Sequence, residues 1–293
     1  MPVRSTEALN PAAEDLHALP PETAMARLLL AQQTALEAVT PAIPALVRTA
    51  EAAAAALRAG GRLGYAGAGS SGLMALADCL ELPGTFGLDP AQTPMIFAGG
   101  AGGLLRMAGG VEDDAAAARD ALAKAGLAAG DVVLVVSASG TTPYALAVAH
   151  AARAQGVTVA GVANVAGAAL LEAADIPVLL ETGAEMVAGS TRLGAASAQK
   201  VALNMISVMV GLRLGHVHRG RMVNLLADNA KLGERAARIV AELAEVPPAA
   251  AEAALARSGG AVKTAILVAR GRSPDEAEAA LQAAGGDLTR IGG

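Results

Sequence analysis

The sequence contains no tryptophan, and only 1% of its 293 residues are aromatic. Proteins that bind single-stranded nucleic acid stack the bases on aromatic side chains, so this class of site is nearly excluded. The net charge is −5 and the sequence pI is about 5.4, which gives no basic surface of the kind that attracts nucleic acid. A polar ligand must therefore be held by hydrogen bonds, and an anionic group must be bound locally.

Cysteine is almost absent, since Cys79 is the only one in the chain. An internal disulfide and a thiol zinc cluster are therefore impossible, and a reducing compartment is favoured. His216 and His218 would face the same side of an extended segment, but two histidines without a third ligand are weak evidence for a metal. We expect no metal site and no cofactor.

Long uninterrupted apolar runs are also lacking. Residues 1–23 contain prolines and acidic residues where a secretory signal would need an apolar segment. The longest apolar helix candidate, residues 195–213, is interrupted by Gln199, Lys200 and Asn204, so we expect it to fall short of a membrane span. These patterns predict a soluble, cytoplasmic protein without a membrane or nucleic-acid partner.

Hydrophobic residues make up 54% of the chain, which is enough to bury a sizeable core. Near-continuous apolar segments alternate with alanine-rich segments of helical character. This alternation predicts a parallel sheet covered on both faces, that is, a doubly wound α/β domain. The strand candidates are residues 62–68, 94–100, 131–140, 157–164 and 176–181.

Helical segments flank the predicted sheet. Two helices are expected at residues 21–39 and 43–59, and the strand signals disappear from about residue 240. Three short helices follow, and the sequence from Ser273 to Glu276 is a capping box that starts one of them. The expected organisation is a leader and helix in residues 1–42, a sheet domain in residues 43–239 and a C-terminal helical module in residues 240–293.

Two glycine and serine turns stand where strands end and helices begin. The first is "GAGSSG" at residues 67–72, and the second is "SASGTTPY" at residues 137–144. A single turn of this kind is more often only a helix cap. Two such turns stand at equivalent places here, and the sequence has neither a dinucleotide-binding pattern nor a P-loop lysine. We therefore favour a phosphorylated small molecule as the ligand, held by hydroxyls and backbone amides. The hydroxyls concerned are Ser70, Ser71, Ser137, Ser139, Thr141 and Thr142, with a third cluster around Ser190.

Two glutamates are candidates for general acid and general base catalysis. Glu81 is expected at the end of the helix that "GAGSSG" starts, where Pro83 and Gly84 stop it, beside Leu82 and Phe86. The dipole and burial would then raise its pKa. Glu112 is expected to open an alanine-rich helix whose dipole keeps it ionised. Opposite environments are typical of an acid and base pair, although a glutamate at a helix end is usually a solvated surface residue.

Five segments resemble, in order and spacing, the N-acetylmuramic acid 6-phosphate etherases, members of the sugar isomerase (SIS) domain superfamily. They are "GAGSSGLMALADCLELPGTFG", "GGVEDD", "SASGTTPY", "GAEMVAGSTR" and "SAQKVALNMIS". The leader "TEALNP" and the segment "GGAVKTAILVARG" are also similar to the family, so the likeness covers nearly the whole chain. It implies a flavodoxin-like sheet and a UBA-like C-terminal module.

The resemblance also implies a reaction. The family cleaves the lactyl ether at carbon 3 of N-acetylmuramic acid 6-phosphate, which gives N-acetylglucosamine 6-phosphate and D-lactate. Its two catalytic glutamates fall on Glu81, the proton donor, and Glu112, whose role as base is a hypothesis. The residues implied to bind the sugar phosphate are Gly69, Ser70, Ser71, Ser137, Ser139 and Thr142, with Ser190 completing the set. The superfamily also implies a homodimer, in which Asn224, Asp228, Asn229 and Lys231 could reach a neighbouring subunit's site.

Four positions depart from the family pattern, and they leave the exact substrate open. Leu73 and Thr141 replace residues that are usually arginine, and Leu82 and Gly84 interrupt the usual "E-C-P-P-T-F". Glu185 matches a further acidic position, where an ion pair is as reasonable as a ligand contact. Two other functions stay open: a sugar phosphate aldose–ketose isomerase, and a non-catalytic sugar phosphate sensor. The isomerase would need no glutamate pair in these motifs.

Overall fold

The computed structural model describes residues 5–107, 109–225 and 230–291. The chain divides into two compact units, each of which is discontinuous in sequence. The sheet unit comprises Met1–Cys79 and Ala91–Ser207, and the C-terminal unit comprises Leu80–Pro90 and Val208–Gly293. These spatial units do not coincide with the segments expected to end at residues 42 and 239.

The sheet unit contains a five-stranded parallel sheet with the order β2-β1-β3-β4-β5. This is the flavodoxin-like order, and it confirms the predicted doubly wound fold. All five residues of β1 and of β3 are buried, as expected for strands covered on both faces. The strands are β1 (Leu63–Gly67), β2 (Met95–Phe97), β3 (Val132–Val136), β4 (Thr158–Ala163) and β5 (Ile176–Leu179).

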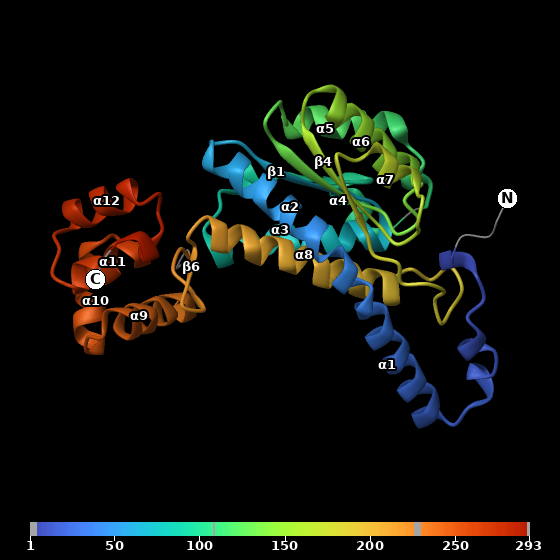
Figure 1. Ribbon diagram of the computed structural model, residues 1–293, viewed down its shortest axis with the longest axis horizontal. Helices are drawn as coiled ribbons and strands as arrows, with labels where there is room; N and C mark the ends of the chain where they lie inside the picture. Colours follow the sequence, from blue (N-terminus) through green and yellow to red (C-terminus); the bar gives the residue numbers. More distant parts are fainter. Residues whose placement is uncertain (1–4, 108, 226–229, 292–293) are drawn as a thin grey trace. The chain divides into compact units, whose positions relative to one another are not determined.

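Helices cover the two faces of the sheet (Figure 1). One face is covered by α5 (Ala115–Ala125), α6 (Pro143–Ala154) and α7 (Ala169–Ala173). The other is covered by α2 (Val39–Arg58), together with the parts of α3 (Gly69–Phe86) and α8 (Gly194–Arg213) that belong to this unit. In a parallel sheet with helices on both faces, the residues that follow the strands lie along one edge of the sheet.

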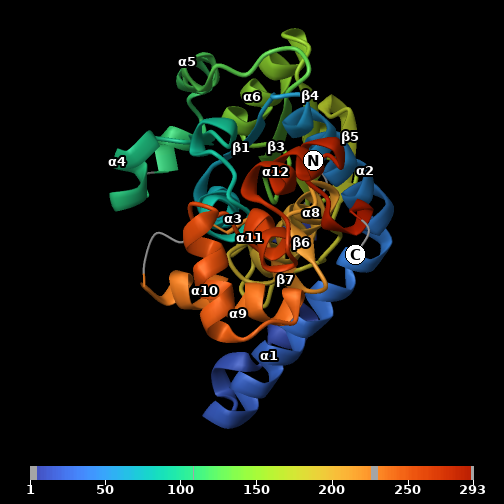
Figure 2. The same ribbon diagram turned by 90° about the vertical axis from the view of Figure 1, so that its left-hand side faces the viewer.

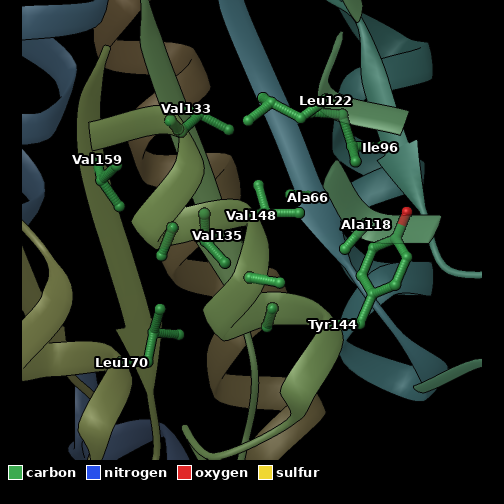
Figure 3. Packing of buried hydrophobic residues seen from close by; sticks show 14 of the residues in the cluster. Ala66, Ile96, Ala118, Leu122, Val133, Val135, Tyr144, Val148, Val159 and Leu170 are labelled. Carbon is green, nitrogen blue, oxygen red and sulfur yellow. The ribbon is translucent and has the colours of Figure 1, made fainter. Parts of the chain in front are cut away.

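One hydrophobic core lies between the sheet and helices α5 and α6. Val133 and Val135 of β3 gather there with Tyr144 and Val148 of α6 (Figure 3). None of the four exposes more than 1% of its surface. Burial of an apolar side chain of this size stabilises a fold by about 1.5–3 kcal/mol, so this layer fixes the strand ends that carry the candidate site.

The N-terminal part of the sheet unit consists of short turns and one long helix. Helix α1 (Pro21–Glu37) is separated from α2 at Ala38, close to the predicted break. Gly60, with φ of +81°, follows the end of α2, as the sequence predicts. The other helical elements of this unit are α4 (Gly100–Leu105) and the 3-10 turns Ser5–Glu7, Pro11–Ala13, Leu16–Ala18 and Gly109–Glu112. A further 3-10 turn, Pro90–Gln92, lies at the boundary between the two units.

The C-terminal unit has its own apolar core. Val223, which follows the strand β7, is among its buried residues, as are Ile239, Val240 and Ile266. The helices that supply the last three are orange to red in Figure 2. The capping box predicted at Ser273 is present, because the side chains of Ser273 and Glu276 bond each other's backbone N–H groups. The elements are β6 (Val217–His218), β7 (Arg221–Met222), α9 (Ala230–Ala244), α10 (Pro248–Arg257), α11 (Val262–Ala269), α12 (Pro274–Ala283) and a 3-10 turn at Leu288–Arg290.

Helix α8 is long and apolar enough to cross a membrane by length and composition, with a mean hydropathy of 1.3. The expectation that its polar residues would bring it below such a span was therefore wrong, because its many apolar residues outweigh them. Of the apolar window, 56% is buried inside the protein. Gln199, within the helix, donates a hydrogen bond to Asn164 Oδ1 at 2.8 Å, which is typical of a core helix.

The sequence predicts that helix α3 ends at Pro83 and Gly84, but this prediction was wrong. The helix continues to Phe86, with Pro83 inside it. Glu81 therefore lies more than one turn before the end of the helix, not at its C-terminus. The boundary between the two units falls within this helix, after Cys79.

Candidate active site

The turn between β1 and α3 is built from glycines that let a strand and a helix approach closely. A Cβ on Gly67 would lie 2.8 Å from the Cα of Gly72. Gly69 begins α3 with a φ of +54°, a conformation that favours glycine. Ser70 follows it, partly exposed, in the first turn of the helix. The first N–H groups of a helix have no partner within it and can donate to an anion, as the sequence predicts for this turn.

Glu112 lies directly over this turn. Its Oε1 would stand 2.6 Å from a Cβ placed on Gly69. The carboxylate therefore shares the space above the start of α3, although 43 positions separate the two residues in sequence (112 − 69 = 43). The structure thus brings one predicted catalytic residue to the predicted anion-binding turn.

The environment of Glu112 differs from the expected one. It closes the 3-10 turn Gly109–Glu112, and Asp114, rather than Glu112, caps α5 by accepting from the N–H groups of Ala116 and Ala117. Burial raises the pKa of Glu112, and the nearby charge of Asp113 raises it further. The expectation that Glu112 opens the alanine-rich helix was wrong, and burial and Asp113 act on its pKa in the direction opposite to the expected effect of a helix dipole.

The loop after β3 arranges its hydroxyls in pairs. Ser137 Oγ and Thr142 Oγ1 are 2.9 Å apart, and Ser137 Oγ also accepts from the N–H of Gly140 at 3.1 Å. Thr141 Oγ1 donates to Ser139 Oγ at 3.2 Å. Ser137 is buried, whereas Ser139 and Thr142 are partly exposed. These bonds fix the loop so that the exposed hydroxyls have defined directions.

Ser71 connects the two turns. Its Oγ accepts a hydrogen bond from the backbone N–H of Ala138 at 3.1 Å, and the side chain is buried. The β1 and β3 loops, which belong to adjacent parallel strands, are therefore held together by a side chain that the sequence predicted to bind ligand directly. Ser71 therefore stabilises the arrangement of the two loops, whether or not it also binds ligand.

Glu81 is placed on α3 with its side chain exposed. Its neighbour Leu80 is also exposed, by 67%, whereas Leu82 and Phe86 are buried. The burial on which the expected environment of Glu81 depended is therefore absent in the single chain. Glu81 belongs to the C-terminal unit and Glu112 to the sheet unit.

Ser190 lies in a turn that the N-terminal leader contacts. Its N–H donates to the carbonyl of Val187 at 2.9 Å, and the N–H of Gly189 donates to the carbonyl of Thr6 at 2.9 Å. The carboxylate of Glu7 lies over Gly189, with Oε2 2.7 Å from the position of a Cβ. The leader thus supports the loop that carries this predicted ligand residue.

The same loop is fixed at its other end. Asn10 Nδ2 donates to the carbonyl of Ala184 at 2.9 Å. Glu185 is buried, and its two carboxylate oxygens accept from the N–H groups of Gly194 and Ala195, each at 2.9 Å. Glu185 therefore caps α8. A cavity of about 250 Å³ lies between the leader, α1 and the segment that carries Glu185, and its lining includes neither of the two glycine and serine turns.

Sequence reasoning missed a buried carboxylate in the middle of α3. Asp78 accepts from Tyr65 Oη at 2.8 Å, from Asn204 Nδ2 at 2.7 Å and from Ser207 Oγ at 2.9 Å. Lys200 Nζ donates to Asn204 Oδ1, as its i and i+4 spacing suggests. The sequence signal for such a buried carboxylate is an aspartate within an otherwise apolar helical segment. This network joins β1, α3 and α8 inside the sheet unit.

The structure gives the burial and the location of each residue that departs from the family pattern. Thr141 is bonded within its own loop through Ser139, and Leu82 is buried at 1% exposure. Gly84 is exposed in the last turn of α3, and Leu73 is partly exposed in the second turn. Asp228 and Asn229 lie outside the described residues. Within the ranges that are described, three or more His, Cys, Asp or Glu side chains nowhere gather as metal ligands.

Comparison with known proteins identifies the family. The SIS domain model matches residues 31–164. An N-acetylmuramic acid 6-phosphate etherase from Deinococcus radiodurans is 42% identical over 289 residues, which cover 98% of this chain and 95% of that protein. An N-acetylmuramic acid 6-phosphate etherase from Aeromonas hydrophila subsp. hydrophila is 38% identical, over 97% of this chain and 96% of that protein.

Solved structures agree on the fold. A phosphoheptose isomerase from Francisella tularensis is similar with a TM-score of 0.51 at 18% identity, over 65% of this chain and 97% of that one. At this identity the likeness concerns the fold alone. The near full-length similarity to the etherases, together with the five-stranded sheet and its paired turns, shows that the chain belongs to the N-acetylmuramic acid 6-phosphate etherase family.

Proposed function

We propose that the protein cleaves the lactyl ether of N-acetylmuramic acid 6-phosphate and releases D-lactate and N-acetylglucosamine 6-phosphate. The names and full-length similarity of the relatives support this reaction. The observation that carries it in this chain is the position of Glu112 over Gly69, at the turn suited to an anionic substrate. Such a reaction belongs to the carbon–oxygen lyases and requires no metal or cofactor in this proposal.

The sugar phosphate would be held by the two connected turns. Backbone N–H groups at the start of α3 and the hydroxyls of Ser70, Ser139 and Thr142 offer donors to phosphate oxygens. Ser137 and Ser71 would in addition fix the two loops, through the bonds that join Ser137 to Thr142 and Ser71 to the N–H of Ala138. Ser190 would complete the set from the loop that the leader supports. Binding would then depend on hydrogen bonds and not on the arginines that Leu73 and Thr141 replace.

Glu112 would act as the base. In the open-chain sugar, carbon 2 is next to the aldehyde, so its C–H bond can break with the proton going to a carboxylate and the electron pair being stabilised as an enolate. A base works best when its pKa approaches the operating pH. The raised pKa of Glu112 therefore makes it a stronger base than an ordinary glutamate. Activity should rise with pH as this carboxyl ionises.

Glu81 would act as the acid. When the C3–O bond breaks, its electron pair goes to the lactate oxygen, which takes the proton from Glu81, and an unsaturated aldehyde remains. Water then adds at carbon 3 and carbon 2 is reprotonated, which restores both carboxyl groups. Without protonation, an alkoxide is a poor leaving group, and positioned proton transfer contributes about 10²–10⁴-fold.

The exposed apolar surface of the N-terminal helices supports a homodimer. Helix α1 has Met25 and Leu29 exposed, and Leu36, Ile43 and Val47 continue an apolar stripe along α1 and α2. Ala35 is the one buried residue among the 17 of α1. A helix with so little packing gains stability when its apolar face meets another surface. A second copy of the chain would provide that surface, as expected for a cytoplasmic enzyme whose partner is otherwise a small sugar phosphate.

The decisive experiment measures D-lactate released from N-acetylmuramic acid 6-phosphate by the purified protein. Glu81→Gln should lose about 10²–10⁴-fold in kcat, whereas Glu172→Gln, which changes an exposed glutamate on α7, should keep wild-type activity. Glu112→Gln should stop exchange of the carbon 2 proton with solvent deuterium, and persistence of that exchange would rule out Glu112 as base.

The two remaining functions predict different results in the same assay. Tight binding of the sugar phosphate with no lactate release would favour a sensor. Interconversion of an aldose phosphate and a ketose phosphate, unaffected by Glu81→Gln, would favour an isomerase. Either result would contradict the etherase proposal.

A further inference from the structure

The last turn of α3 has a composition that opposes a helix. Pro83 has no N–H to donate to the carbonyl of Cys79, and Gly84 follows it. In a helix interior, proline and glycine are less favourable than alanine by about 3 and 1 kcal/mol. The helix nevertheless continues to Phe86. Contacts from outside this segment must therefore hold its last turn in place.

The ring of Phe86 provides the first of these contacts. It is buried, with 4% of its surface exposed. It packs directly on Gly211, where a Cβ would lie 2.6–3.1 Å from three ring carbons. Gly211 belongs to the end of α8 that lies in the C-terminal unit, as Phe86 does. Only a residue without a side chain leaves room for the ring at this place.

The carbonyl of Phe86 provides the second contact. It accepts a hydrogen bond from Asn224 Nδ2 at 2.9 Å and another from the ring of His216. The next residue, Gly87, has a φ of +64° and is so near Asn224 that a Cβ would collide with the carbonyl oxygen of Asn224. We call Gly211, His216 and Asn224 the Phe86 clamp.

The clamp is rooted in the core of the C-terminal unit. The N–H of Val223 donates to the carbonyl of His216 at 2.9 Å, which ties the two clamp segments together. Val223 and Leu225, on either side of Asn224, are buried in the core that α9 to α12 form. The clamp is therefore packed together with the C-terminal helices.

Glu81 depends on this turn for its direction. It precedes Phe86 by five residues, which is about 7.5 Å along a helix axis at 1.5 Å per residue. Its side chain is exposed, so its direction depends on the backbone of α3. If the last turn of α3 unwound, the backbone at Glu81 would lose the hydrogen bonds of the turn that follows it.

We propose that the Phe86 clamp, which lies within the C-terminal unit, positions Glu81 for proton donation. This inference rests on the proposed etherase reaction. In this proposal His216 and Asn224 are positioning residues, which act through the last turn of α3. A loosened clamp should slow C–O cleavage, which needs the acid, and spare proton removal at carbon 2, which needs the base.

The test compares two reactions of one variant. For Asn224→Ala, kcat for lactate release should fall by about 10²-fold, the typical cost of a misplacement of about 1 Å, with KM within twofold of wild type. Exchange of the carbon 2 proton with deuterium should continue at a near wild-type rate. Asn224→Asp keeps the shape but removes the donor to the Phe86 carbonyl, so it should lose at least as much kcat.

A matched control separates the clamp from general damage to the unit. Glu242→Gln weakens a 2.7 Å bond with Arg221 in the same unit and should leave both reactions unchanged. If Asn224→Ala does not fold, His216→Ala removes the other donor and should show the same split. A parallel loss of exchange and cleavage, or a kcat within twofold of wild type, would overturn the clamp. Absence of lactate release by the wild type would instead overturn the proposed function.

Discussion

The carboxylate of Glu112 stands over Gly69, where a Cβ would come within 2.6 Å of Oε1. The glycine thus serves two purposes, because it adopts the left-handed φ that starts α3 and leaves space for the proposed base. A turn suited to an anion and a carboxylate that can accept a proton are therefore parts of one arrangement. The absence of a side chain at residue 69 matters as much as the presence of one at residue 112.

Gly69→Ala should reduce catalysis more than stability. The new methyl would push Glu112 out of place, and a shift of about 1 Å costs about 10²-fold in rate. The left-handed φ adds about 1–2 kcal/mol of strain. Gly167→Ala is the matched control, since Gly167 has a φ of +67° with open space around its Cβ position. Both variants should lose similar free energy of unfolding in urea, and only Gly69→Ala should lose kcat. Equal kcat values would contradict the steric argument.

Asp78→Ala should strongly destabilise the sheet unit. Removal of the carboxylate leaves the donors of Tyr65, Asn204 and Ser207 without this acceptor, and each buried unsatisfied group costs about 1–3 kcal/mol. We expect a loss of at least about 3 kcal/mol of unfolding free energy by urea denaturation. Asp120→Ala, at an exposed position of α5, should change it by less than about 0.5 kcal/mol. A loss below about 1 kcal/mol for Asp78→Ala would show that the network is not stabilising.

Acid should destabilise the C-terminal unit through His216. Burial lowers its pKa from 6.5 to about 4, and the charge of Lys263 acts in the same direction. Between these values the unfolded chain binds a proton that the folded chain excludes, so stability falls as pH decreases from 6.5 to 4. The melting temperature of the wild type should therefore fall more between pH 7 and pH 4.5 than that of His216→Asn. Parallel curves would indicate that His216 titrates normally in the folded protein.

Cys79 should be unreactive in the folded protein. Burial raises the pKa of its thiol to about 11, with a further contribution from the charge of Asp78. Only the thiolate reacts with disulfide reagents, so a chromogenic disulfide at pH 8 should label the protein only after denaturation. Leu80→Cys places a second thiol at a neighbouring position that is 67% exposed, and that variant should react with one equivalent at once. Rapid labelling of the native wild type would contradict the buried environment.

The sheet could be predicted from sequence because its signals are local. Each strand is a short apolar run, and the turns at Gly69 and Ser137 follow two of them directly. The capping box at Ser273 is equally local, and the structure contains it. Glu112 differs, because the burial that raises its pKa depends on the folded structure, and because α5 begins three residues after it.

The course of α3 shows why other parts could not be predicted. Local propensity ends the helix at Pro83, and this is a sound reading of the segment alone. The contacts that extend it come from Gly211, His216 and Asn224, more than 120 positions later (211 − 86 = 125). Asp78 was overlooked for the same reason, since its partners at residues 204 and 207 lie on a distant helix.

The discontinuous C-terminal unit has a consequence for biosynthesis. A chain leaves the ribosome from its N-terminus, and domains generally fold as units as they emerge. The sheet unit is complete once Ser207 has emerged, whereas Leu80–Pro90 must wait for Val208–Gly293. A segment made early thus reaches its final structure last. A nascent chain stalled before its end would carry an assembled sheet without the packing that supports Glu81, the proposed acid, so translation itself would delay activity until the whole polypeptide is finished.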